Sequence, residues 1–191
     1  MVDDRNRSPD PYPGPMLELV VPDASRQAEW LAMADEFDRA RIDGGAMGSA
    51  TVDELREPET FAAWVRMLID HERGRNVPDE MVASTTRWIA VDGRLVGFLS
   101  IRHDLNEFLR ELGGHIGYAI RPSQRRQGYA TAATALALTE CRRLGIDPVL
   151  ITCDDTNLAS RRVIERNGGV LEDIRGVKRR YWVTLSEYSS A

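Results

Sequence analysis

Arg125, Arg126 and Gly128 stand directly before an alanine- and leucine-rich run that is typical of a helix and extends to Gly145. The first turn of a helix leaves backbone N–H groups unpaired, and the helix dipole places positive potential at the same end. A phosphate fits such a turn, because its oxygens accept from those N–H groups. Glycine lets the backbone approach the ligand, and the arginines add charge-assisted contacts. The pattern therefore predicts a seat for a phosphate or pyrophosphate.

Two common nucleotide-binding loops do not fit this stretch. The loop of nucleoside triphosphatases ends in Gly-Lys-Ser/Thr, and no such run occurs in the chain. The dinucleotide fingerprint needs three spaced glycines after a strand, whereas only Gly128 is available. Two other interpretations stay open, namely a solvated cluster of arginines and a site for RNA or another phosphorylated ligand. The net charge of -5 and the lack of interleaved basic and aromatic residues outside the turn argue against a nucleic-acid partner.

The N-terminal half is expected to supply a strand, two helices and a hairpin. The apolar run 17–23 predicts the strand, and Ser25 is the expected N-cap of the first helix. The second helix is expected over the apolar positions of 61–69, ending near Gly74. Two β-branched runs on either side of Asp92-Gly93 predict the hairpin.

The C-terminal half carries the phosphate turn between two further strands. The strand 115–120 is halted by Pro122, which cannot donate to a ladder, and the long helix follows. The continuously apolar run 148–154 predicts a strand buried on both faces. Asn157 opens another helix, and two strands are expected in the tail after it. This order predicts a mixed α/β fold with one sheet and no strict alternation of strands and helices.

The length of 191 residues suits a single domain, which we place at 16–191, preceded by an extended or disordered arm at 1–15. Cys141 and Cys153 lie inside expected elements, and two cysteines are too few for a disulfide scaffold. We therefore expect both to be small core residues in a cytoplasmic protein. No stretch approaches the roughly 20 apolar residues of a membrane span, so no membrane partner is expected.

The motif Arg125-Arg126-Gln127-Gly128-Tyr129-Ala130 follows the strand HIGYAI and leads into the long helix. The run Asn157-Leu158-Ala159-Ser160 opens the helix after that one. In this order the features resemble the GNAT superfamily of N-acetyltransferases, closely over 115–169 and in element order over 95–185. The resemblance implies a fold of the α+β type. Its central sheet would be mixed, mostly antiparallel and of about seven strands, with splayed central strands and flanking helices.

The same resemblance implies acetyl-CoA as co-substrate and no metal. The pyrophosphate would lie on the N–H groups of 125–130, and the pantetheine arm would add to the edges of the two splayed strands. Asn157 would bind the pantetheine or a nearby water, or simply cap its helix. The cofactor-binding residues implied in this way are Ala119, Ile120, Arg125, Arg126, Gln127, Gly128, Tyr129, Ala130, Asn157 and Ser160.

Acetyl transfer needs a neutral amine, a polarised thioester and a proton for the leaving thiolate. A lysine-like amine has a pKa of about 10.4, so a base or a desolvated site must remove its proton. His115 is the first candidate base, with a surface histidine as the alternative, and Tyr118 faces either the thioester or the core. Many family members carry a proton-donating tyrosine seven residues after the asparagine, whereas this chain has Ile164 there. Further candidates for the base, which could equally be solvated residues, are His103, Asp104, Glu107 and Glu111. Asp154 and Asp155 either bind a cationic amine or solvate their turn, and a covalent route through Cys153 is the less favoured alternative.

The acceptor is expected to contact the N-terminal half. The aromatic residues there are either core or an acceptor cage, namely Trp30, Phe37, Trp64 and Trp88. The acidic residues either attract an amine or form a solvated helix face, namely Asp35, Glu36, Asp38, Asp43, Asp53 and Glu54. We predict an N-acetyltransferase, a monomer or homodimer, that acts on a primary amine, with a small molecule favoured over a protein. The alternative is a non-catalytic acyl-CoA-binding module.

Overall fold

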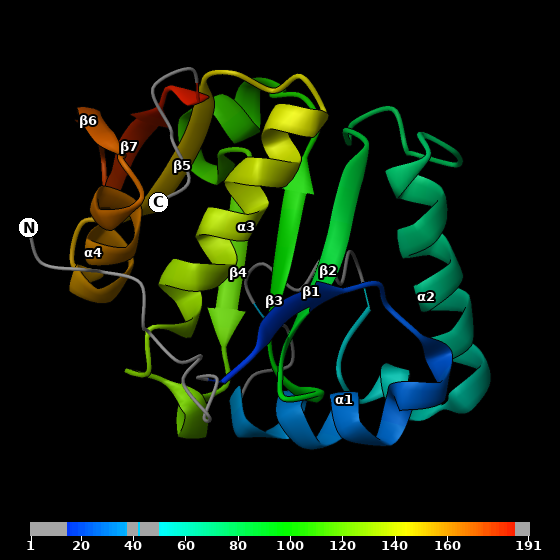
Figure 1. The fold of residues 1–191 in the computed structure, drawn as a ribbon. Coiled ribbons are helices and arrows are strands. Elements are labelled where there is room, and N and C mark those ends of the chain that lie inside the picture. The colour runs from blue at the N-terminus through cyan, green and yellow to red at the C-terminus, as the bar shows by residue number, and fades with distance from the viewer. Residues whose placement is uncertain (1–14, 38–41, 43–49, 186–191) are drawn as a thin grey trace, which may run out of the picture.

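The computed structural model describes residues 15–37, 42 and 50–185. Seven strands form two antiparallel sheets, with the orders β1-β2-β3-β4 and β5-β7-β6 (Figure 1). The predicted class is confirmed, but the strands are divided between two sheets. The expected arm at 1–15 lies outside the described residues except for Pro15, and the single domain stays a prediction. The strands are β1 (Leu17–Val20), β2 (Ser84–Val91), β3 (Arg94–Arg102), β4 (Ile116–Ile120), β5 (Val149–Asp154), β6 (Val170–Arg175) and β7 (Lys178–Val183).

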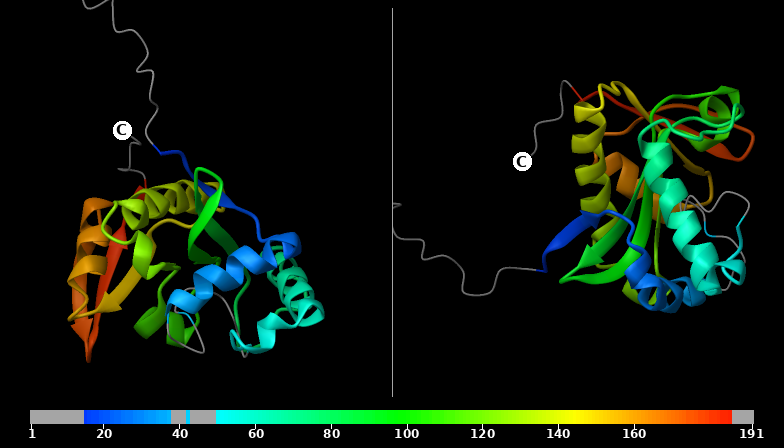
Figure 2. Two further views of the ribbon diagram at one scale, coloured as in Figure 1. Left: turned by 90° about the horizontal axis from the view of Figure 1, so that it is seen from below. Right: turned by 90° about the vertical axis from the view of Figure 1, so that its right-hand side faces the viewer.

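Helices cover both faces of the first sheet. In Figure 2 the sheet passes between α3 on one side and α1 with α2 on the other. The α-helices are α1 (Gln27–Ala34), α2 (Pro58–Glu72), α3 (Tyr129–Arg143) and α4 (Leu158–Arg166). Short helical turns join them, namely η1 (Ala24–Arg26), η2 (Asp35–Phe37), η3 (Glu54–Arg56), the π-helical turn η4 (Leu109–Gly113) and η5 (Pro122–Gln124). Within the described ranges, no helix has the length and apolar character needed to cross a membrane.

The hairpin of β2 and β3 turns at Asp92 and Gly93, as predicted. Both residues have positive φ, 48° and 77°, which a two-residue hairpin turn of the I′ type requires. Ser84 pairs with Arg102 at the open end of the hairpin. β2 and β3 form the middle of the first sheet, and β4 pairs with the other edge of β3.

Ser25, the residue predicted to cap the first helical segment, was wrong. Asp23 is the N-cap, because its Oδ1 accepts from the N–H of Ser25 at 2.8 Å. Ser25 lies inside η1, and the α-helix proper begins at Gln27. The segment therefore consists of three short helical pieces, and the last one, η2, ends beside the predicted phosphate turn.

An aromatic cluster fills the space between α1, α2 and the sheet. Trp30, Phe61 and Trp88 are fully buried, and Trp64 is 5% exposed. The ring centroids of Trp30 and Trp64 lie 5.1 Å apart at an angle of 62°, a favoured edge-to-face geometry. The tryptophans are therefore core residues, and the alternative of an acceptor cage is not supported.

The other face of the sheet is covered by α3. Ala133, Ala137 and Cys141 are fully buried against the sheet, whereas Leu144, the C-cap residue, is 40% exposed. Small side chains let this helix lie close to β3 and β4. Cys141 and Cys153 are both buried and unpaired, as expected for core residues.

Candidate active site

The turn before α3 has the backbone geometry of an anion seat. Gly128 is the N-cap residue with a φ of 84°, and no side chain caps the helix. Arg126 also has positive φ, 65°. Alternation of left-handed residues with others turns successive N–H groups towards one point. The first-turn N–H groups, from Tyr129 onwards, have no acceptor inside the helix, so the turn presents several donors together.

The two arginines of this turn lie differently from each other. Arg125 Nε donates to the carbonyl of Ile120 at 3.0 Å, and its guanidinium lies 6.0 Å from the centroid of the Phe37 ring. The Arg126 residue is exposed. Neither forms an ion pair with any carboxylate in the described part of the chain, so both positive charges remain for an anion. The expected direct contact of Arg125 with the phosphate stays a prediction, because its side chain is directed to the end of β4.

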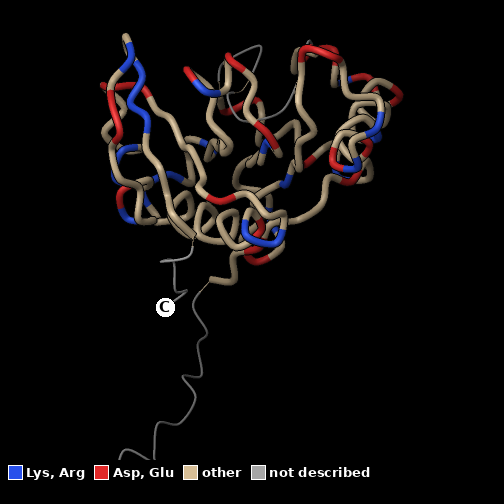
Figure 3. Tube along the Cα trace, turned by 90° about the horizontal axis from the view of Figure 1, so that it is seen from above, with Lys and Arg blue, Asp and Glu red and all other residues tan. Residues whose placement is uncertain are grey.

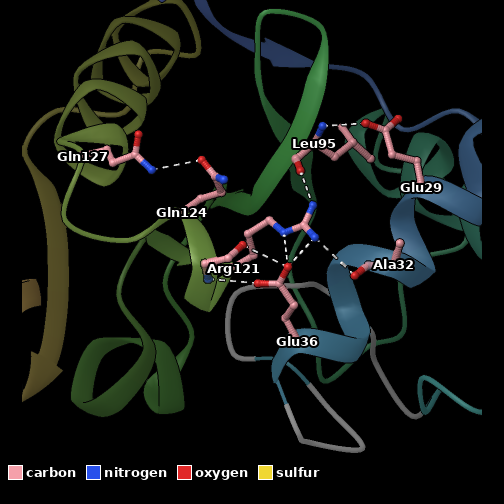
Figure 4. A network of polar contacts seen from close by, with 8 residues as sticks. Glu29, Ala32, Glu36, Leu95, Arg121, Gln124 and Gln127 are labelled. Atoms are coloured by element: carbon pink, nitrogen blue, oxygen red, sulfur yellow. Dashed lines mark hydrogen bonds and ion pairs between the residues drawn. The ribbon is translucent and has the colours of Figure 1, made fainter.

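A network that the sequence did not reveal holds the start of the turn (Figure 4). Glu36 in η2 accepts from Arg121 Nε at 2.8 Å and also from Arg121 Nη2. Its other oxygen accepts from the N–H of Ser123 at 2.9 Å. These contacts, above all the hydrogen bond with Arg121, lower the pKa of Glu36 to about 2. Glu36 is therefore ionised at any physiological pH and ties α1 to the phosphate turn.

The network continues along the turn itself. Gln127 Nε2 donates to Gln124 Oε1 at 3.0 Å, and the Tyr129 hydroxyl donates to Gln127 Oε1 at 3.0 Å. The predicted site residues Gln127 and Tyr129 thus hold each other with their side chains. Their backbone N–H groups are the parts that remain available to a ligand.

The two sheets meet at the starts of β4 and β5. The N–H of His115 donates to the carbonyl of Leu150 at 2.7 Å, and the N–H of Leu150 donates to His115 Nδ1 at 2.9 Å. A Cβ on Gly114 would lie 2.8 Å from the same carbonyl, so only glycine allows this close approach. Beyond this point β4 and β5 belong to separate sheets, as expected for splayed strands.

The edge of β4 that faces β5 carries backbone groups of alternate residues. A Cβ on Gly97 would lie 2.3 Å from the carbonyl oxygen of Ala119, so that carbonyl is directed at β3. Because backbone groups alternate between the two sides of a strand, those of Tyr118 and Ile120 are directed at the gap. Arg125 occupies the Ile120 carbonyl. The backbone groups of Ala119 therefore face β3, whereas those of Tyr118 and the N–H of Ile120 face the gap, and the expected contacts with the donor stay a prediction.

The phenol oxygen of Tyr118 is buried and has no hydrogen-bond partner in the part of the chain that the structure describes. Burial raises the pKa of Tyr118 to about 12. The Ser160 hydroxyl is near enough to the phenol to offset part of this rise, although the two groups do not have regular hydrogen-bond geometry. Ser160 belongs to the first turn of α4, where its N–H donates to Asn157 Oδ1 at 3.0 Å. Asn157 is thus the N-cap of α4. The tyrosine and the asparagine motif come together, although they lie on different elements.

His115 does not have the geometry of a general base. Its Nδ1 is already an acceptor for the N–H of Leu150. In the neutral imidazole the other nitrogen then carries the proton and can only donate. Burial lowers the pKa of His115 to about 4. The contacts of His115 are therefore those of a residue that links the starts of β4 and β5.

Most of the remaining candidates are engaged elsewhere. His103 Nε2 contacts Thr85 Oγ1 at 2.9 Å, and Asp104 Oδ1 accepts from the N–H of Leu105 at 2.7 Å. Ile164, at the position of the family's tyrosine, is fully buried. Glu107 is exposed. The other three form ion pairs: Glu111 with Arg175, Asp154 with Lys178, and Asp155 with Arg179.

The arginine-rich tail is balanced by acidic neighbours, and Figure 3 shows both charges around the β6–β7 hairpin. Besides the three pairs just given, Arg180 contacts Asp173 at 3.0 Å. A basic surface for a nucleic acid therefore does not form on this hairpin.

The acidic residues of the N-terminal half also have local partners. Asp35 and Asp53 both pair with Arg56, at 2.5 and 3.3 Å, and Glu54 accepts from the N–H of Thr51 at 2.8 Å. Asp38 and Asp43 lie outside the described residues. These contacts suit the interpretation of a structured, solvated surface.

Comparisons with known proteins agree with the fold. Residues 52–170, more than half of the chain, match the model of the acetyltransferase (GNAT) domain. RimJ of Mycobacterium smegmatis, solved with CoA-disulfide, has a TM-score of 0.67 and 21% identity, over 93% of this chain and 89% of that one.

Two other solved structures show the same fold. RimL, a ribosomal L7/L12 alpha-N-protein acetyltransferase solved with coenzyme A, has a TM-score of 0.60 and 21% identity, over 88% of this chain and 93% of its own. The microcin C7 self-immunity acetyltransferase MccE, solved with acetyl-CoA and AMP, has a TM-score of 0.62 and 15% identity, over 88% of this chain and 92% of its own. The search of curated protein sequences gave no significant match. The family match confirms the resemblance seen in the motifs, and the chain belongs to the GNAT acetyltransferase family.

Proposed function

We propose that the protein transfers an acetyl group from acetyl-CoA to a primary amine by direct attack within a ternary complex. The observation that carries the proposal is the uncapped turn at Gly128, which lies at the end of an open strand edge. A pyrophosphate on the turn and a pantetheine arm along β4 would use both features at once. Family membership supports the donor, and the similar structures of RimJ, RimL and MccE were each solved with a form of coenzyme A.

The residues that would hold the donor follow from the geometry. The N–H groups of the turn and of Tyr129 and Ala130 would donate to the pyrophosphate, with Arg126 adding charge. The N–H and carbonyl of Tyr118 would pair with the pantetheine as a neighbouring strand does. Any donor N–H near the thioester oxygen also stabilises the charge that develops on it during attack.

Tyr118 is proposed as the proton donor to the leaving thiolate. The amine nitrogen forms a bond to the thioester carbon, the carbon–sulfur bond breaks, and the sulfur takes the electron pair. The phenol of Tyr118 is buried beside Ser160 of α4 and forms no regular hydrogen bond within the described residues, so it would give its proton to that sulfur and regain one from solvent. With Ile164 in place of the family's tyrosine, a residue on β4 would take over this role. The amine loses its own proton to solvent, and His115 takes no part in this step.

The acceptor class has two candidates. A small amine is the prediction from the sequence, whereas the likeness to RimJ and RimL favours a protein α-amine as the second candidate. Both are primary amines and need the same donor site. Thioester consumption measured with a panel of small amines and with short peptides that have free N-termini separates the two.

The first experiment is a calorimetric titration of acetyl-CoA into the protein and into two variants. Gly128→Asp adds a negative charge at the seat and should abolish binding, because the carboxylate repels the pyrophosphate. Gly145→Asp is the matched control at the other end of α3, since Gly145 also has positive φ, 74°, and a Cβ there meets no atom within 4 Å. Its binding should equal that of the wild type.

Three outcomes are informative. Absence of binding to the wild type would remove the proposed donor. Equal loss in both variants would mean that the effect arises from folding and not from the seat. Tight binding without thioester turnover on any amine or peptide would favour the non-catalytic acyl-CoA-binding module.

A further inference from the structure

The carboxylate of Glu36 has no role in the chemistry described so far, yet all its acceptor capacity is directed at the phosphate turn. One oxygen accepts from Arg121 and from the Ser123 hydroxyl at 3.0 Å, and the other accepts from the Ser123 N–H. Glu36 lies 85 residues before Arg121 in the chain. The contact is therefore a tertiary link between the end of the first helical segment and the start of the turn.

Arg121 is fixed from several sides by this arrangement. Besides Glu36, its guanidinium donates to the carbonyls of Leu95 at 3.2 Å and Ala32 at 3.4 Å (Figure 4). Its own carbonyl accepts from the N–H of Gln124 at 2.9 Å. Gln124 then holds Gln127, which precedes Gly128. A continuous series of contacts thus runs from Glu36 to the residue before the N-cap of α3.

The neighbour of Glu36 contacts the same turn independently. Phe37 lies under the guanidinium of Arg125 and packs on Phe98, with ring centroids 5.7 Å apart. Two consecutive residues of η2 therefore contact residues on both sides of η5. Asp35, the first residue of η2, points elsewhere and pairs with Arg56.

We infer that Glu36 is a positioning residue for the pyrophosphate part of the donor site, acting through Arg121 and Ser123. The inference rests on the proposed function, because it assumes that the turn receives a pyrophosphate. It predicts that Glu36 matters for donors that carry the pyrophosphate and not for a donor that consists of the thioester arm alone.

Two roles of Glu36, as a nearby negative charge or as a support for the turn, predict opposite changes in Kd when the carboxylate is removed. If Glu36 acted only as a nearby negative charge, its removal would strengthen the binding of an anion. If it holds the turn in shape, its removal weakens binding, because misplaced N–H donors no longer converge on the phosphate. The sign of the change in Kd therefore decides between the two roles.

The experiment measures Kd for acetyl-CoA by calorimetry in the wild type, Glu36→Gln, Glu36→Ala and Asp35→Asn. We expect Glu36→Ala to raise Kd by about tenfold. Glu36→Gln should lie between it and the wild type, because glutamine keeps a neutral acceptor. Asp35→Asn is the matched control, since it removes an ion pair of the same turn that does not touch the phosphate loop, and it should leave Kd unchanged.

A second donor, S-acetylpantetheine, lacks the pyrophosphate and tests the same variants by thioester consumption with an amine that the wild type accepts. Its kcat/KM should be the same in all four proteins. Equal or tighter binding of acetyl-CoA by both Glu36 variants would overturn the inference, and so would a parallel loss with S-acetylpantetheine. If Glu36→Ala fails to fold in a thermal melt, Glu36→Gln decides. Failure of the wild type to bind acetyl-CoA would instead refute the proposed function together with this inference.

Discussion

The side chain of His115 takes the place of a backbone acceptor in the link between the two sheets: its Nδ1 receives the N–H of Leu150, while its own N–H donates to the carbonyl of Leu150. A protonated imidazole cannot accept at Nδ1. The link therefore depends on the neutral form of the ring. Burial already favours that form and lowers the pKa to about 4.

A pH dependence of stability follows from this pKa. An unfolded chain binds a proton at His115 below about pH 6.5, whereas the folded protein does so only near pH 4. The stabilisation is therefore complete above pH 6.5 and is lost as the pH falls towards 4. The free energy of unfolding should decrease by on the order of 3 kcal/mol over this range. Urea unfolding at several pH values measures it.

The control for this dependence is His115→Asn, whose carbonyl can accept from Leu150 but does not titrate. Other groups change protonation in the same range, including His103, whose pKa burial also lowers. The difference between wild type and variant isolates His115. Parallel curves for the two proteins would contradict the assignment.

Tyr118→Phe should separate catalysis from stability. The phenol oxygen forms no regular hydrogen bond among the described residues, so its loss should leave the free energy of unfolding unchanged or slightly raised. If Tyr118 donates the proton to the thiolate, kcat should fall by about 10²-fold, with the Kd for acetyl-CoA unchanged. Steady-state kinetics beside calorimetry checks this.

Tyr181→Phe is the matched control for Tyr118→Phe. The Tyr181 hydroxyl donates to Glu165 Oε1 at 3.2 Å, so this variant should lose about 1 kcal/mol of stability and keep its kcat. Unchanged kcat in both variants would exclude Tyr118 as the proton donor.

Cys153→Ala should remain active. Burial raises the pKa of the Cys153 thiol to about 11, so almost none of it is the nucleophilic thiolate at neutral pH. A direct transfer to the amine needs no thiol from the protein. Mass spectrometry after incubation with acetyl-CoA should find no acetylated cysteine, and an acetylated Cys153 with an inactive alanine variant would establish the covalent route instead.

Gly97→Ala should destabilise the protein and loosen β4. The new Cβ would lie 2.3 Å from the backbone carbonyl of Ala119, and a backbone atom cannot rotate away as a side chain can. Overpacking of this kind costs roughly 1–3 kcal/mol. Unfolding in urea gives the loss directly, and an unchanged midpoint would show that β3 and β4 adjust without strain.

The features that the sequence predicted are those encoded within a few residues. The turn at Asp92 and Gly93, the N-cap at Asn157 and the uncapped start of α3 at Gly128 each depend on neighbours in the chain, and each was found where expected. The predicted N-cap at Ser25 was wrong, because the side chain of Asp23, two residues earlier, caps the same helical segment.

The features that the sequence missed depend on contacts between distant residues. Glu36 looked like one acidic residue among several, and only folding brings it to Arg121 and Ser123. His115 looked like a base because its residue type titrates near neutral pH, but the N–H of Leu150 occupies its free nitrogen. The contacts of Arg125 with the carbonyl of Ile120 and the Phe37 ring were likewise not visible in the sequence, and its expected contact with the phosphate stays a prediction.

The division of the strands into two sheets has a consequence for the protein in the absence of its donor. Beyond His115 and Leu150, the inner edges of β4 and β5 belong to different sheets, and an open strand edge is a template for pairing with another chain. A donor lying along these edges would cover them. Concentrated solutions without coenzyme A should therefore scatter more light on storage than solutions that contain it, so the ligand would protect the protein against aggregation as well as serve as its acetyl source.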